Sequence, residues 1–350
     1  MQFTYKSLPA HVTFGRGSRA GIGQELERLG ITRAIVLSTP GQTWLADQVA
    51  REIGKRVAAV FPGAAMHTPV DVTASALEIV GSSGADGVLS VGGGSTIGLG
   101  KAIALRTDLP QLVVPTTFSG SEMTAVIGQT ENGVKTTQKT MAVLPEAVIY
   151  DPDLVTALPG RVAGPSGMNA IAHSVEGLYA EEANPIVSMM AEESIRSMGR
   201  ALPRILDNPN ETDAWNEALY GAFLAGICLG SVGMAIHHKI CHTLGGSFDL
   251  PHADIHCLML PYSAAYNREA APDAMSRIAK ALDGEDGPTA LYDLMQKTAT
   301  KKSLKEFGLN EANLDRAADM ATKNPYYNPR PVTREGVREM LQAAYEGRLP

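Results

Sequence analysis

The stretch DGVLSVGGGST, residues 86–96, joins a short apolar run directly to three consecutive glycines. A bounded apolar run of this length is typical of a strand buried in a parallel sheet. Because glycine has no Cβ atom, the backbone at Gly93 and Gly94 can approach a diphosphate, and the N-terminus of a following helix favours the anion. The turn indicates a nucleotide site. A tight turn without a ligand is equally consistent, since Ile97 replaces the third glycine of G-x-G-x-x-G.

Strand and helix patterns alternate on both sides of this turn. Apolar runs predict strands at residues 33–38, 56–61, 86–91, 111–115 and 147–150. Helices are predicted at residues 42–53 and 71–81, and a third follows the turn at residues 92–96 and runs through residue 103. Such alternation is typical of a parallel sheet wound with helices. A second turn rich in hydroxyl groups, residues 116–121, follows the next strand and is expected to flank the same edge of the sheet. Ordinary turn chemistry explains it as well.

The pattern changes after Pro159, where strand signals stop. Long amphipathic segments take over at residues 186–206, 214–229 and 273–282. A chain of 350 residues also exceeds what one hydrophobic core usually supports. We therefore predict an α/β plus all-α protein: a Rossmann-like, parallel-sheet, dinucleotide-binding domain at residues 1–158 and a helical catalytic domain at residues 159–350.

Composition excludes several classes of protein. Hydrophobic residues make up 44% and charged residues 19% of the chain, which is typical of a globular protein. A formal net charge of -7 argues against a nucleic-acid partner. No apolar run has membrane-spanning length, and the first residues lack a signal-peptide pattern. Three cysteines without a CxxC pair favour a reducing compartment, so we expect a cytoplasmic protein without a membrane partner.

Histidines gather in the second half of the chain. Of the eight histidines, six lie between residues 173 and 256. Residues four apart share a helix face, and three pairs have this spacing: Asn169 with His173, His238 with His242, and His252 with His256. A single pair is usually structural, whereas three pairs indicate helices that converge on one polar pocket.

The chemistry of this pocket has two interpretations. Neutral imidazoles suit zinc or ferrous iron, while protonated imidazoles attract a carboxylate substrate. His237 and His256 are expected to contribute least, because each can face outward or satisfy a backbone carbonyl.

The motifs, taken in order, resemble the iron-containing alcohol dehydrogenase family, which includes glycerol dehydrogenase and dehydroquinate synthase relatives. The resemblance covers almost the whole chain. It rests on the glycine turn, residues 116–122, residues 151–154, residues 167–173, the His238-x-x-x-His242-Thr-Leu-Gly motif and Pro251-His252. It implies a nicotinamide-dependent oxidoreductase with the two-domain organisation predicted above.

In that family an aspartate and three histidines bind the metal, and the resemblance places these ligands at Asn169, His173, His238 and His252. His242 would lie beside the substrate. Asn169 departs from the pattern, because an amide lacks the charge of a carboxylate and should weaken binding of a divalent metal. We therefore expect catalysis that does not require a metal.

The resemblance also implies the cofactor site. Thr39 stands where many relatives carry the acidic residue that binds the adenosine ribose, so repulsion of a 2′-phosphate is reduced and either NADH or NADPH is expected. Lys135 would lie near the cofactor ribose, although a solvated loop lysine is the alternative. The cofactor-binding residues implied in this way are Thr39, Gly93, Gly94, Ser95, Thr116, Thr117, Ser121 and Lys135.

Within the family, residues 116–124, 135–137 and 324–331 resemble a subgroup that carries asparagine at the acidic metal position. The resemblance implies reduction of a double bond conjugated to a ketone in a small dicarboxylate, during breakdown of aromatic compounds, by a homodimer. His242, His173, His238 and His252 would be catalytic. Substrate contacts would come from Asn169, Ser119, Tyr326 and Arg330, with packing on the helical core as the alternative for the last two.

Three other functions remain open at this point. The same fold serves metal-dependent alcohol or polyol dehydrogenases, and it serves lyases of the dehydroquinate synthase type that use NAD only transiently. A protein that keeps the fold but only binds the cofactor is the third.

Overall fold

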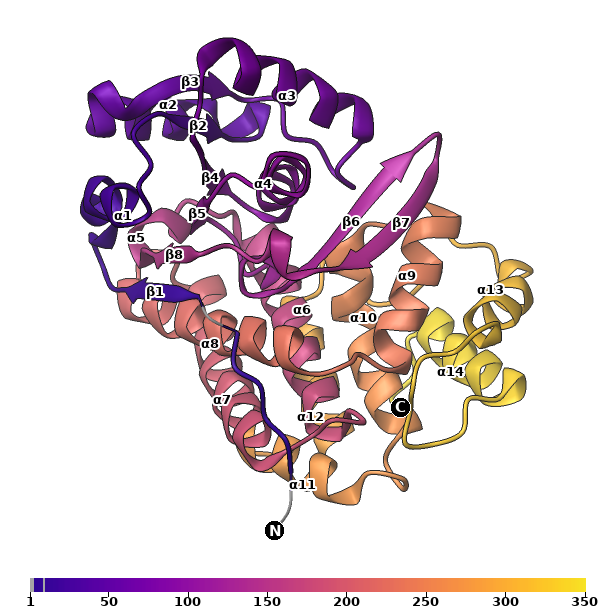
Figure 1. The fold of residues 1–350 in the computed structure, drawn as a ribbon. Coiled ribbons are helices and arrows are strands. Elements are labelled where there is room, and N and C mark those ends of the chain that lie inside the picture. Colours follow the sequence, from indigo (N-terminus) through magenta and orange to yellow (C-terminus); the bar gives the residue numbers. More distant parts are fainter. Residues whose placement is uncertain (1–2, 9) are drawn as a thin grey trace. The chain divides into compact units, whose positions relative to one another are not determined.

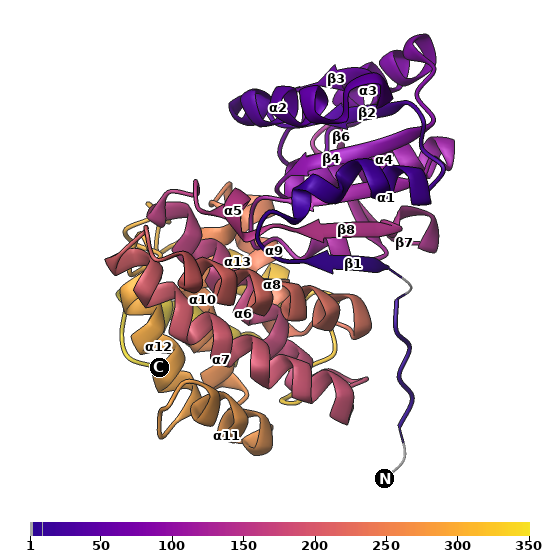
Figure 2. The same cartoon turned by 90° about the vertical axis from the view of Figure 1, so that its left-hand side faces the viewer.

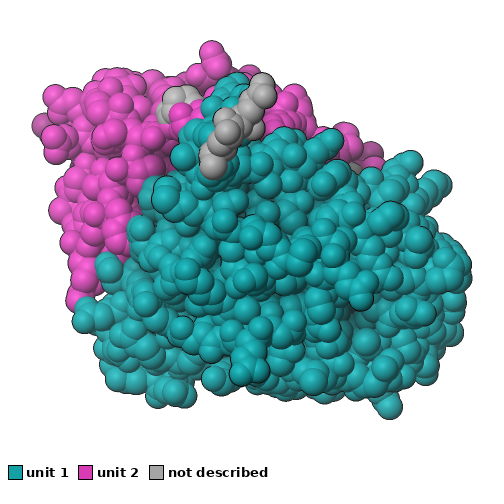
Figure 3. Space-filling model, turned by 90° about the horizontal axis from the view of Figure 1, so that it is seen from below, with its two compact units in different colours: residues 1–6, 158–350 teal, residues 7–157 magenta. Residues whose placement is uncertain are grey.

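The chain divides into two compact units. The structure, a computed structural model, describes residues 3–8 and 10–350. One unit, the α/β unit, contains residues 7–157, and the other, the helical unit, contains residues 158–350 together with residues 3–6 (Figure 3).

A six-stranded sheet forms the centre of the α/β unit (Figure 1). Its order is β1-β8-β5-β4-β2-β3, and every neighbouring pair is parallel. The strands are β1 (His11–Phe14), β2 (Ala34–Leu37), β3 (Val57–Phe61), β4 (Gly87–Gly92), β5 (Gln111–Pro115) and β8 (Ala147–Tyr150). The predicted class of fold is thereby confirmed.

Helices cover both faces of this sheet because its central strands are apolar on both sides. The helices are α1 (Ile22–Arg28), α2 (Thr43–Ile53), α3 (Val70–Ser83), α4 (Gly94–Thr107) and the short α5 (Pro152–Val155). On one face α1 and α2 pack against Val36 and Leu89. On the other, α3 and α4 pack against Ile35, Leu37 and Val88. Short 3-10 helices are η1 (Ser18–Gly21), η2 (Pro40–Gln42), η3 (Gly54–Arg56), η4 (Ser121–Met123) and η5 (Met141–Val143).

Two features of this unit were not predicted. Strand β1 is short and partly exposed, so its sequence carries little apolar signal. Strands β6 (Val126–Glu131) and β7 (Val134–Lys139) form an antiparallel hairpin. The connecting Asn132 and Gly133 both have positive φ angles, of 50° and 76°, as a two-residue hairpin turn requires.

The helical unit is built around a buried helix, α6 (Gly160–Tyr179). Helices α7 (Pro185–Asp207), α8 (Thr212–Ser231) and α10 (His252–Tyr266) pack against it, as Figure 2 shows for α7 and α8. Helix α9 (Ile236–Phe248) packs against α10. The remaining helices are α11 (Pro272–Ala281), α12 (Gly287–Thr298), α13 (Asn313–Thr322) and α14 (Arg334–Glu346).

Among the described residues, no single helix is long and apolar enough to cross a membrane. Helices α8 and α9, which are bent by 97° at the break between them, meet that criterion only when they are taken together.

Candidate active site

The glycine turn of the α/β unit lies between β4 and α4. Strand β4 ends at Gly92, and α4 begins at Gly94. The turn is approached closely by the next polar turn, because a Cβ atom on Gly93 would lie 2.8 Å from side-chain atoms of Thr117. The amide of Thr116 also donates a hydrogen bond to the Gly92 carbonyl at 3.1 Å. The two polar turns therefore lie side by side.

A third segment joins them at the same edge of the sheet. Thr39 follows β2, and β2 pairs with β4. Gln42, which the sequence analysis missed, donates a hydrogen bond from Nε2 to Thr116 Oγ1 at 2.8 Å. Thr39, residues 93–95 and residues 116–121 thus follow the carboxyl ends of three adjacent strands. Open α/β sheets bind their ligands at this edge.

The other residues predicted in this unit have different surroundings. Ser119 Oγ accepts a hydrogen bond from the amide of Ser121 at 3.3 Å and would lie 3.0 Å from a Cβ atom on Gly94. Ser119, predicted to bind substrate, therefore lies against the glycine turn. Lys135 lies on β7 opposite Thr130, and its side chain is outside the described part of the chain.

The helical unit brings together the four histidines predicted to be catalytic. His173 lies on α6, His238 and His242 lie on α9, and His252 begins α10. Ring centroids are 5.2 Å apart for His173 and His238, 5.9 Å for His238 and His242, and 6.3 Å for His242 and His252. Asn169 lies one turn before His173 on α6 and is buried.

A buried carboxylate that the sequence analysis missed orients His238. Glu176 Oε2 lies 2.6 Å from His238 Nδ1, and the carboxylate also accepts hydrogen bonds from the amides of Ala235 at 2.8 Å and His237 at 2.7 Å. Glu176 therefore satisfies amides at the start of α9, where a helix favours negative charge. Because a carboxylate only accepts, His238 carries a proton on Nδ1, and its Nε2 is buried without a hydrogen-bond partner.

Burial sets the charge of His173. Burial, followed by the neighbouring His238, His252 and His242, lowers the pKa of His173 well below its ordinary value. His173 is therefore neutral near pH 7.

His242 has a different environment, because its side chain is exposed and its Nδ1 lies 3.3 Å from the hydroxyl of Tyr326. Burial raises the pKa of Tyr326, so its hydroxyl keeps its proton.

His237 and His256 were expected to face outward or to satisfy a backbone carbonyl, and the structure contradicts these surroundings. That they contribute least to the site stays a prediction. Both side chains are fully buried, and His237 Nε2 lies 3.0 Å from His256 Nδ1. With Cys241 they form a group whose nitrogen and sulfur atoms lie within 4.8 Å of one another, a spacing that suits a metal. However, the two imidazoles already share a hydrogen bond. Burial raises the pKa of the Cys241 thiol well above its ordinary value, so the thiol keeps its proton.

The residues at the family's metal position do fit a divalent ion. Asn169 Oδ1, His173 Nδ1 and His238 Nε2 are buried without a hydrogen-bond partner. An amide oxygen and imidazole nitrogens are metal donors, and a carboxylate on the second nitrogen of a ligating histidine is the usual arrangement. The expectation that no metal is required therefore finds no support in this geometry and stays a prediction.

Arg330, predicted to contact substrate, packs against Tyr266. Its guanidinium lies 4.1 Å from the ring centroid and donates a hydrogen bond from Nη1 to the Tyr266 carbonyl at 3.2 Å. These contacts favour the packing role that the sequence analysis left open.

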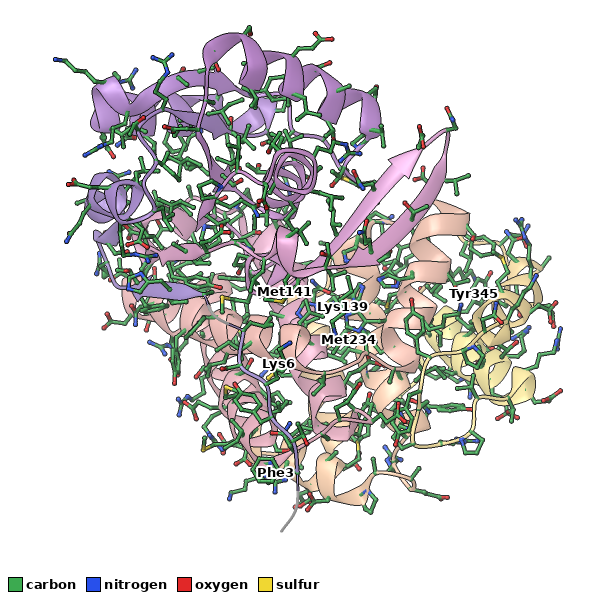
Figure 4. All side chains as sticks on the ribbon, viewed as in Figure 1. Phe3, Lys6, Lys139, Met141, Met234 and Tyr345 are labelled. Carbon is green, nitrogen blue, oxygen red and sulfur yellow. The ribbon has the colours of Figure 1, made fainter. Side chains whose placement is uncertain are left out.

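A pocket of about 310 Å³ adjoins Tyr326 in the helical unit. Its lining includes Tyr327 and Met234, which is labelled in Figure 4 and lies between α8 and α9. The hydroxyl of Tyr326 links this pocket to His242.

A polar, glycine-containing edge on a parallel sheet and an imidazole cluster on buried helices define the class of protein: a nucleotide-dependent enzyme with acid–base groups. The comparisons name the family. Residues 9–152 match the model described as iron-containing alcohol dehydrogenase, and residues 164–345 match the C-terminal model of the Fe-containing alcohol dehydrogenase family. The chain belongs to the iron-containing alcohol dehydrogenase family, as its motifs predicted, and is an oxidoreductase. Membership implies a nicotinamide cofactor.

Relatives within this family are similar over their full length. A maleylacetate reductase of Rhizobium sp. (strain MTP-10005) is 52% identical over 99% of both chains. One from Sphingobium indicum is 48% identical over 100% of this chain and 99% of its own. The crystal structure of maleylacetate reductase from Agrobacterium tumefaciens is 49% identical, with a TM-score of 0.97 over 100% of both chains.

Proposed function

We propose that this chain reduces maleylacetate to 3-oxoadipate with NADH or NADPH. The observation that carries the proposal is the full-length identity of about half the residues with several maleylacetate reductases. Asn169, at the position where the wider family has an acidic metal ligand, agrees with it.

The reduction requires a hydride and a proton. When bound, the reduced nicotinamide supplies the hydride, which forms a C–H bond at the alkene carbon β to the ketone. The alkene π electrons move toward the ketone, and negative charge develops on its oxygen as an enolate. Protonation of the α carbon then restores the ketone, so that one double bond has become a single bond.

The role of each histidine in this reaction follows from its hydrogen-bond partner and its protonation. We assign the oxyanion contact or the proton transfer to His242, whose Nδ1 is held by the hydroxyl of Tyr326. His173 is neutral and serves as an uncharged contact. Glu176 holds a proton of His238 on Nδ1 and thereby orients the ring.

A dicarboxylate substrate also needs a cation. Lys239 Nζ lies 5.6 Å from the centroid of the Tyr326 ring, on the same helix as His242. We propose that Lys239, which the sequence analysis did not single out, meets one substrate carboxylate.

Asn169, His173, His238 and His252 would hold a divalent ion, which would polarise the ketone oxygen when bound. We propose that turnover does not depend on such an ion, because none of the four residues brings a negative charge. The unpaired acceptors Asn169 Oδ1 and His238 Nε2 favour the second candidate, a metal-dependent alcohol or polyol dehydrogenase.

One assay separates these functions. Protein purified without chelator is mixed with maleylacetate and either reduced nicotinamide, with and without a chelator, and absorbance at the reduced-nicotinamide band is followed. We expect stoichiometric loss of absorbance in both conditions. Loss of activity on chelation, restored by one divalent metal, favours the metal-dependent enzyme. Turnover without net absorbance loss would indicate a lyase.

We further propose a homodimer in a reducing cytoplasm, with a small dicarboxylate as its partner and neither nucleic acid nor membrane. All three cysteines, Cys228, Cys241 and Cys257, are buried and unpaired, which suits a reducing compartment.

A further inference from the structure

Three buried side chains of the helical unit form a hydrogen-bonded chain, here called the relay: Ser263, His237 and His256. His237 Nδ1 lies 2.9 Å from Ser263 Oγ, and His237 Nε2 lies 3.0 Å from His256 Nδ1. All three side chains are fully buried. None of them has a part in the function proposed above.

The relay fixes where each imidazole carries its proton. The hydroxyl of Ser263 donates to the carbonyl oxygens of Met259 at 3.1 Å and Leu260 at 2.9 Å, so Ser263 Oγ accepts from His237. His237 therefore carries its proton on Nδ1 and presents a lone pair on Nε2. That lone pair accepts from His256, whose proton is consequently on Nδ1. The second nitrogen of His256, Nε2, is left bare.

His256 lies against the catalytic histidines. Its ring centroid is 4.4 Å from that of His252, 4.8 Å from that of His238 and 6.4 Å from that of His242. Yet the bare Nε2 of His256 has no hydrogen-bond partner. Burying a hydrogen-bond acceptor without a partner costs free energy. Two apolar side chains in place of His237 and His256 would fill the same space without this cost.

We propose that the relay is a positioning device of the active cluster: it holds His256 in the Nδ1-protonated form, so that Nε2 accepts a hydrogen bond from an N–H or O–H donor in that cluster. His256 acts through this donor, which it orients for the proton transfer. Glu176 likewise holds a proton on Nδ1 of His238, so two separate anchors orient neighbouring imidazoles of one cluster. The kinetic part of this inference rests on the proposed function, whereas the proton positions do not.

The proton positions are tested by long-range ¹H–¹⁵N spectra of protein labelled at histidine. Signals are assigned by their loss in His256→Asn and His237→Gln. We expect both residues to be protonated on Nδ1, and we expect Ser263→Ala to move protons to Nε2. A wild-type His256 protonated on Nε2 overturns the inference, whether or not the protein turns over maleylacetate.

The role of Nε2 is tested by two variants. The amide of His256→Asn lies near the position of Nδ1 and can still donate to His237, but it leaves no atom at the position of Nε2. We expect kcat to fall about tenfold or more, as for other residues that orient catalytic groups, while the Kd for NADH is unchanged. His256→Gln places a polar atom near the position of Nε2 and should recover part of kcat.

Cys241→Ala is the matched control. Cys241 Sγ lies 3.7 Å from His237 Nε2 but is not part of the relay, so its loss should leave kcat within about twofold of wild type. If folded His256→Asn keeps the wild-type kcat and KM, the inference is overturned. It is also overturned if Cys241→Ala loses as much kcat as His256→Asn. If His256→Asn does not fold, the proton positions of the wild type decide alone. A wild type without maleylacetate turnover refutes the proposed function instead.

Discussion

At the scale of single residues, His242 differs from the other histidines of the cluster. It is exposed, whereas His173, His238 and His256 are buried. If His242 meets the developing enolate, His242→Ala removes a contact made in the transition state, and kcat should fall about 10²–10³-fold. Steady-state kinetics measure the loss, with NADH binding as the control. Near-normal kcat would leave His242 a packing role only.

Asn169 determines the charge of the family's metal position in this chain. Because His173 and His238 are uncharged ligands in their lone-pair forms, Asn169→Asp adds the only negative charge among the directly binding residues. We expect its affinity for a divalent ion to rise by about an order of magnitude or more. Metal content after dialysis against a weak chelator measures this, with Asn169→Ala as the control. Equal metal content in all three proteins would mean that no ion binds beside residue 169.

The sequence predicted which histidines gather but not which atoms face one another. Spacing of four residues placed Asn169 with His173 on one face, and the structure agrees. Glu176 escaped prediction because its partners, the amides at the start of α9, are about 60 residues away along the chain. The buried surroundings of His237 and His256 were not predicted, because the direction of a helical side chain depends on the packing of the whole helix.

At the scale of elements, the glycine turn links β4 to α4. Gly94 is exposed, and a Cβ atom there would meet the side chain of Ser119, with Oγ at 3.0 Å and Cβ at 3.7 Å, so the fold should tolerate a side chain. A valine would instead occupy the space through which a diphosphate approaches the helix N-terminus. Gly94→Val should therefore raise the KM for NADH about tenfold or more, with thermal stability near wild type. Unchanged cofactor affinity would remove this turn from the site.

The start of β4 is tied to β2 by Asp86. Its carboxylate accepts hydrogen bonds from the amides of Thr32 at 3.0 Å and Arg33 at 2.7 Å. Partial burial raises the pKa of Asp86, but the hydrogen bonds from Thr32 and Arg33 outweigh it and hold the pKa below its ordinary value. Asp86→Asn should lower the free energy of unfolding by about 2 kcal/mol at pH 7.

The sign of this shift fixes the pH dependence. A carboxyl group whose pKa is lower in the folded protein stabilises it above the ordinary pKa, and this contribution is lost as pH falls through the folded value. The difference between wild type and Asp86→Asn should therefore persist from pH 7 to about 5 and shrink below about 4. Urea unfolding at these pH values measures it. A difference that grows toward low pH would contradict the assignment.

The elements themselves were predictable in proportion to their burial. Strands β2, β4, β5 and β8 are buried at every residue, so their apolar runs stood out. Strand β7, with the sequence VKTTQK, is polar and forms only a two-stranded ribbon with β6. Its clearest sequence signal was the Asn132-Gly133 turn.

At the scale of the whole molecule, the chain carries a formal net charge of -7, while the proposed substrate is a dianion. The alternation of strands and helices was enough to predict the fold class of each half of the chain. The net charge, in contrast, does not determine the electrostatic field at a particular site. At a separation of about 25 Å, the Coulomb repulsion between these charges is about 2 kcal/mol in unscreened water. At an ionic strength of about 0.01 M, screening leaves about half of this repulsion.

The rate of substrate encounter should consequently depend on salt. The Debye length falls from about 30 Å at 0.01 M to about 8 Å at 0.15 M ionic strength, so the repulsion nearly disappears over this range. We expect kcat/KM for maleylacetate to rise about fivefold, with kcat unchanged, because only the encounter is affected. Initial rates at several concentrations of an inert salt measure this change in kcat/KM. Lys239→Met serves as the comparison, since loss of the proposed local cation should enlarge the salt effect. A fall of kcat/KM with salt would mean that the field at the site is positive despite the net charge.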